Sequence, residues 1–194
     1  MKKTFLFVLI AISLISCKKS DHTDASAGMD IKLGTSWTYK YTDYDAAGTV
    51  VSTSNVTLTI TGQASLLGET WWVATGAGSP SYLRKEATGY YTIRNGVKQL
   101  DFKVPAVLND TWRKTYSAAV GDYSDFKVMA LAQNVTVPFG TISCYYAEGY
   151  DSNSLEDKAW YNDANMMVKQ IEYDQVGVNP VYVDYTLELV SYTP

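Results

Sequence analysis

The sequence predicts an all-β fold in a single domain, either an antiparallel sandwich or a strongly curved, half-barrel-like sheet. Three observations lead to this prediction. Apolar and polar residues alternate over several short segments, tyrosine is abundant with 16 residues, and no segment shows the spacing of an amphipathic helix. Turn-forming residues also separate the alternating segments at short intervals, as they do in sandwiches and barrels.

The clearest strand is Val-Thr-Leu-Thr-Ile-Thr at 56–61, which places three aliphatic side chains on one face and three threonines on the other. The same alternation occurs at 37–42, at 100–104 and at 183–189. Asn95-Gly96 predicts a two-residue hairpin, because both residues tolerate positive φ. Further strands are expected at 70–75, 81–85, 89–94, 97–103, 112–116, 126–131, 141–148, 158–162 and 167–173, and short helical turns at 118–121 and 155–157.

The N-terminus has the order of a secretory signal peptide. Lys2 and Lys3 precede an uncharged, almost wholly apolar run at 5–15, and Ser16 and Cys17 follow it. A helix of 11 residues spans about 16 Å, against about 30 Å for the hydrocarbon core of a bilayer. The run is therefore too short for a transmembrane helix.

Leu14-Ile15-Ser16-Cys17 resembles the lipobox of bacterial lipoproteins. The resemblance implies cleavage before Cys17 and acylation of its sulfur, so that the partner of this residue is the outer membrane. The expected organisation is a signal peptide at 1–16, the lipidated cysteine with a flexible tether at 17–30, and an all-β domain at 31–194. Both the periplasmic face and the cell surface remain open as the location.

Composition limits the classes of partner. The formal net charge is −4, and loss of Lys2 and Lys3 with the signal peptide makes it −6. No basic cluster follows residue 19, so the chain lacks the charge pattern that nucleic acids require. The length of the mature chain suits one domain with a core of its own.

The sequence offers little support for an enzyme. Its one histidine, His22, lies in the tether, so a Ser-His-Asp or Cys-His site has no base in the domain. Cys144 is expected to be a buried core thiol. No cofactor and no metal site are predicted, since Cys/His clusters and phosphate-binding loops are missing from the sequence.

Carboxylates are the remaining catalytic candidates. Glu148, Asp151, Glu156 and Asp157 lie close together in the sequence, and we expect them in a solvated loop. A hydrolase that cleaves glycosidic bonds needs two carboxylates on either side of the scissile bond. Because these carboxylates are expected in a solvated loop, a carboxylate-based hydrolase is the least favoured of the alternatives.

Adjacent aromatic residues are the candidate ligand-binding groups. Neighbours on a strand point to opposite faces, so one ring of each pair fills the core while the other meets solvent or a ligand. Exposed rings of this kind would bind a glycan or a peptide; the alternative is cross-strand pairing within the sheet. The candidates are Trp71, Trp72, Tyr90, Tyr91, Trp160 and Tyr161.

The C-terminal half carries a second resemblance. The segments 137–145, 160–161, 167–169 and 187–192 resemble an uncharacterised all-β lipoprotein domain. The resemblance implies a wrapped sheet of the kind found in periplasmic lipoprotein carriers. The leading hypothesis is thus a lipid-anchored, non-catalytic binding or structural domain for a glycan, peptide or envelope protein, and the alternative is a carrier or chaperone for lipid or lipoprotein.

Overall fold

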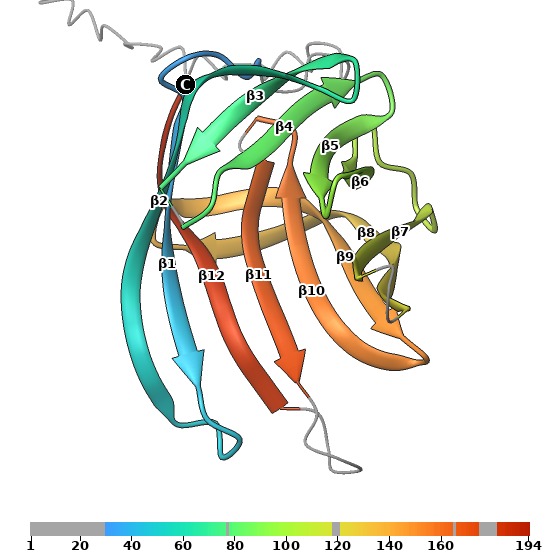
Figure 1. Ribbon diagram of the computed structural model, residues 1–194. Helices are drawn as coiled ribbons and strands as arrows, with labels where there is room; N and C mark the ends of the chain where they lie inside the picture. Colours follow the sequence, from blue (N-terminus) through green and yellow to red (C-terminus); the bar gives the residue numbers. More distant parts are fainter. Residues whose placement is uncertain (1–29, 77, 118–120, 165, 175–181) are drawn as a thin grey trace, which may run out of the picture.

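The computed structural model describes residues 30–76, 78–117, 121–164, 166–174 and 182–194, which form one antiparallel sheet of twelve strands (Figure 1). The all-β prediction is confirmed, in its strongly curved form and not as a sandwich. The segments expected to form the signal peptide and the tether up to residue 29, Cys17 among them, and residues 118–120 lie outside the described residues. The strands are β1 Ser36–Tyr44, β2 Val50–Leu66, β3 Glu69–Thr75, β4 Ser81–Glu86, β5 Gly89–Arg94, β6 Val97–Lys103, β7 Thr111–Ser117, β8 Asp122–Val137, β9 Gly140–Asp151, β10 Ser154–Asn162, β11 Met166–Asp174 and β12 Tyr182–Thr193.

The sheet consists of two six-stranded meanders, β1–β6 and β7–β12, whose first and last strands pair with each other. The strand order is β6-β5-β4-β3-β2-β1-β12-β11-β10-β9-β8-β7, so that β6 and β7 are its two edges. Curvature brings these edges together and nearly closes the sheet into a barrel-like shape (Figure 1). Among the described residues no backbone ladder joins β6 to β7, and we call the line between them the seam.

Local patterns explain most strands. Alternation over 56–61 places Ile60 in the core with 1% exposure, and the Asn95-Gly96 hairpin forms with positive φ at both residues. β2 and β8 are longer than expected and contain register shifts, which bend long strands around a closed sheet. The helical turn expected at 155–157 is wrong, since these residues belong to β10, which pairs with β9 and β11.

A stack of four aromatic rings crosses the inside of the sheet and holds the two meanders together. Phe102 on β6 lies between Tyr90 on β5 and Tyr161 on β10, with ring centroids 4.7 and 4.6 Å away, and Tyr145 on β9 follows at 5.2 Å from Tyr161. All four residues are at most 6% exposed. Stacked rings bury large apolar areas, so this stack fills part of the interior and leaves the remainder to a cavity.

Candidate functional site

The inside of the curved sheet contains a cavity of about 600 Å³, lined by residues from every strand except β8 and β9. One wall is largely apolar and comes from β1–β4 and β12. A second wall is polar and comes from β5, β6 and β7 around the seam, from β11 and from Tyr185 on β12. The apolar wall includes Trp37, Tyr39, Leu58, Ala74, Leu83 and Leu187, and the polar wall includes Arg94, Asp101, Lys114, Tyr116, Gln170, Glu172 and Tyr185.

An ion pair crosses the seam inside the cavity. Lys114 Nζ on β7 lies 2.9 Å from Asp101 Oδ1 on β6 and donates to the hydroxyl of Tyr161 at 3.2 Å. Lys114 is only 7% exposed, so burial acts to lower its pKa, yet Asp101 and the neighbouring groups of Tyr161, Tyr116 and Asp157 together outweigh burial and raise the pKa. Burial acts to raise the pKa of Asp101, and Lys114 overrides it and lowers that pKa. Both groups are therefore charged at neutral pH.

Side chains close the rest of the seam. Trp112 Nε1 donates to the carbonyl of Asp101 at 3.1 Å, and the backbone N–H of Thr115 donates to Gln99 Oε1 at 2.8 Å. Asn95 donates to the carbonyl of a β7 residue, Tyr116. These bonds satisfy edge groups that a ladder would otherwise pair.

Two carboxylates lie side by side at the polar wall: Glu172 lines the cavity, and Asp157, which is 1% exposed, lies behind it. Asp157 on β10 and Glu172 on β11 are directly opposite in the strand register, and Gln170 Nε2 donates to both, at 2.7 and 3.0 Å. The hydroxyl of Tyr116 donates to Asp157 at 3.0 Å, and that of Tyr185 donates to Glu172 at 2.8 Å. Burial and then the charge of Asp157 raise the pKa of Glu172 to about 8. The pair consequently holds one proton at neutral pH.

This pair corrects the sequence-based expectation for the acidic residues. Asp157 is not in a solvated loop; it lies within β10 and is 1% exposed. Glu156 is also in β10 and accepts a hydrogen bond from Ser124. Glu148 lies in β9 and accepts hydrogen bonds from two tyrosines, while Asp151 ends that strand.

The six candidate aromatics are not gathered into one surface. Trp71, Tyr90, Trp160 and Tyr161 are all buried, with at most 8% exposure, whereas Trp72 and Tyr91 are half-buried. Trp71 donates to the carbonyl of Leu66, and Trp160 stacks on Tyr146 and donates to Gln133. Tyr161 is the member of the set that lines the interior cavity.

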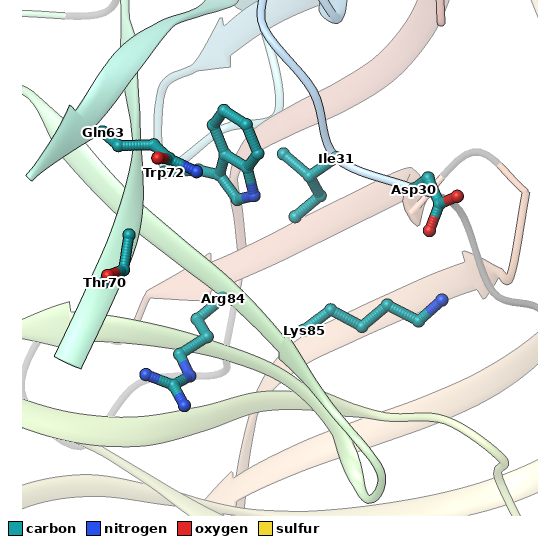
Figure 2. Close-up of a pocket in the computed structure, with 7 residues that line it drawn as sticks. All are labelled: Asp30, Ile31, Gln63, Thr70, Trp72, Arg84 and Lys85. Atoms are coloured by element: carbon teal, nitrogen blue, oxygen red, sulfur yellow. The ribbon is translucent and has the colours of Figure 1, made fainter.

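Trp72 lines a separate, shallower pocket of about 610 Å³ (Figure 2). Its indole lies beside Ile31, while the guanidinium of Arg84 points away from the ring (Figure 2). Arg84 is already paired, with Glu69 at 3.4 Å and Glu86 at 3.0 Å. The pocket thus offers one aromatic ring and one aliphatic side chain among mostly polar residues: Asp30, Gln63, Thr70, Arg84 and Lys85.

Cys144 is confirmed as a buried core thiol. It is 2% exposed, and burial raises its pKa to about 12. A thiol in this environment stays protonated at neutral pH and is a poor nucleophile. Within the described ranges no three His, Cys, Asp or Glu side chains gather as metal ligands, and no helix there has the length and apolarity to cross a bilayer.

Comparison with protein-family models, with curated proteins and with solved structures gives no match to this chain. The candidate site therefore depends on geometry alone. Sequence reasoning missed Lys114, Gln170 and Glu172. Gln170 and Glu172 could have been found, because they lie on the same face of β11 as the buried Met166 and Val168.

Proposed function

We propose that this protein is a lipid-anchored, non-catalytic binding protein of the bacterial outer membrane, and that its ligand is a small amphipathic molecule held inside the curved sheet. The observation that carries the proposal is the cavity of about 600 Å³ with one apolar and one polar wall. Concave, mostly apolar sites with a few placed polar groups are typical of small-molecule binding. Barrel-like sheets commonly hold ligands in this position.

The position of the aromatic residues favours the interior over the outer surface. Four of the six candidates are buried, so they offer no platform to a glycan or peptide in solution. This moves the proposal toward the carrier alternative. Asp157 is 1% exposed and does not line the cavity, so it and Glu172 do not flank a bound sugar as the two carboxylates of a glycoside hydrolase do, which supports binding over hydrolysis.

Filling the cavity tests the proposal. Leu83 lines the apolar wall, and we expect Leu83→Trp to weaken binding of decanol, a neutral amphipathic probe, at least about tenfold, because the larger ring occupies the ligand's place. Isothermal titration calorimetry measures the affinity. Leu33→Trp is the matched control, since Leu33 is 66% exposed.

Thermal unfolding shows whether Leu83→Trp folds, and Leu187→Phe fills the same wall if it does not. Decanol binding that is equally strong in the wild type and in a folded cavity-filled variant would place the probe outside the cavity and contradict the proposal.

The anchor has its own test. We expect Cys17→Ala to remain unacylated and to leave the membrane fraction, because two or more acyl chains on one residue are what makes anchoring stable. Mass spectrometry and cell fractionation measure both effects. Cys144→Ala is the matched control and should stay acylated, since that thiol is buried in the domain. Acylation that persists in Cys17→Ala refutes the anchor.

A further inference from the structure

We propose that the ligand of the interior cavity carries a basic head group, an amine that is protonated in water, and that this head binds to Glu172 while its apolar body lies against Trp37, Leu58 and Leu83. The inference rests on the proposed function and specifies its ligand. It follows from how the charges of the polar wall are distributed.

The cations of the cavity are already engaged. Lys114 pairs with Asp101 at 2.9 Å. Arg94 is exposed at the margin, and its guanidinium carbon lies 5.2 Å from the centre of the Tyr116 ring. Among the described residues, neither Asp157 nor Glu172 forms an ion pair with any of these groups.

The charge of Lys114 acts on Asp157 and that of Glu156 acts on Glu172, but the hydrogen bonds to the pair come from neutral groups. These are the amide of Gln170 and the phenols of Tyr116 and Tyr185. Two carboxylates at this spacing are expensive to ionise together, and the pair keeps a proton up to a pKa of about 8 for Glu172. A ligand ammonium can replace the proton of Glu172 and donate to this carboxylate, which lines the cavity and forms no ion pair with any described residue.

The surroundings also suit such a head group. The ring of Tyr185 lies 5.3 Å from that of Tyr41, and together with Tyr116 these rings place aromatic surface near the carboxylates. Ammonium groups are attracted to aromatic faces. On the apolar wall, Trp37 is 2% exposed, and its Nε1–H has no acceptor among the described residues. A buried donor without a partner is costly, so a polar atom of a bound ligand would complete it.

Decylamine, decanol and decanoate have similar alkyl chains and different head groups. Comparison of their affinities therefore separates the contribution of the head group from that of the apolar body. At pH 7 we expect the wild-type protein to bind decylamine about tenfold more tightly than decanol and more tightly still than decanoate. Titration calorimetry in two buffers of different ionisation enthalpy should show that decylamine releases a proton from the protein, whereas decanol releases none. A carboxylate pair with a purely structural role would not release a proton when decylamine binds.

The variant Glu172→Gln keeps the shape of the side chain and removes its charge. It should weaken decylamine binding about tenfold and leave decanol binding unchanged. Glu188→Gln, on the outward face of β12, is the matched control and should change neither. Equal affinity for all three probes, or decylamine binding without proton release, overturns the basic head group while the cavity stands. Failure of every probe to bind overturns the proposed function as well.

Discussion

Replacement of Lys114 by methionine is expected to lower the free energy of unfolding by about 2–3 kcal/mol, because it leaves the charge of Asp101, whose side chain is 25% exposed, without its partner. Lys114 is 7% exposed, and its charge balances Asp101 across the seam at 2.9 Å. Methionine retains the length of the side chain, so the loss reports the charge and its hydrogen bonds. Urea unfolding monitored by tryptophan fluorescence measures the change.

Two controls define this result. The double variant Lys114→Met with Asp101→Asn removes both charges and should recover more than half of the lost stability, because neutral pairs in buried positions cost little. Arg113→Met breaks the pair with Asp125, in which both side chains are 53% exposed, and should cost far less stability than Lys114→Met, because solvent screens an exposed pair. A loss below about 1 kcal/mol in Lys114→Met would mean that the seam does not depend on this ion pair.

The stability of the wild-type protein is expected to fall as pH rises from about 4.5 to about 8, and Glu172→Gln should remove most of that slope. Burial, followed by the charge of Asp157, raises the pKa of Glu172 from 4.5 to about 8 in the folded state. The folded protein therefore binds more protons than the unfolded chain within this window, and raising the pH favours unfolding. We expect the variant to be more stable than the wild type at pH 8.5 by about 2 kcal/mol, and similar to it at pH 5.

Denaturant unfolding at a series of pH values measures this profile. Glu188→Gln is the matched change outside the cavity, where the carboxylate is paired with Lys169 at 2.8 Å, and it should keep the wild-type slope. A Glu172→Gln profile that runs parallel to that of the wild type would show that Glu172 titrates normally and that the carboxylate pair does not share a proton.

The alternation of apolar and polar residues predicted the strands of the fold, because successive side chains of a strand point to opposite faces of a half-buried sheet. Trp37 and Tyr39 face the core as expected, and Tyr185 and Leu187 share the inward face of β12. The hairpin at 95–96 could also be predicted from the sequence, because its turn depends on the two residues Asn95 and Gly96 themselves.

The residues that line the cavity were harder to predict from the sequence. Alternation placed Asp101 on the face opposite Phe102, yet Asp101 lines the cavity, because β6 is an edge strand and Lys114 reaches it from β7. That contact depends on closure of the sheet between residues far apart in the chain. The burial of Asp157 was not foreseen for a related reason: its environment is set by β7 and β11, which supply the hydroxyl of Tyr116 and the amide of Gln170.

The aromatic pairs show why composition alone could not locate the site. Adjacent aromatic residues on a strand point to opposite faces, but in a closed sheet the outer face can also be covered. Trp71 and Trp160 are thus as well buried as Tyr90 and Tyr161, and no outer platform forms from the four. The number of aromatic residues favoured a binding surface on the outside of the domain, whereas their positions favour a binding site inside the sheet.

The most direct test of the interior site is a crystal structure of the protein with decanol that carries bromine at the end of its chain. The proposed function predicts an anomalous bromine peak inside the sheet, against the wall formed by Trp37, Leu58 and Leu83. A bromine peak found only on the outer surface, such as beside Trp72 in the shallow pocket, with the interior free of the probe, would contradict it.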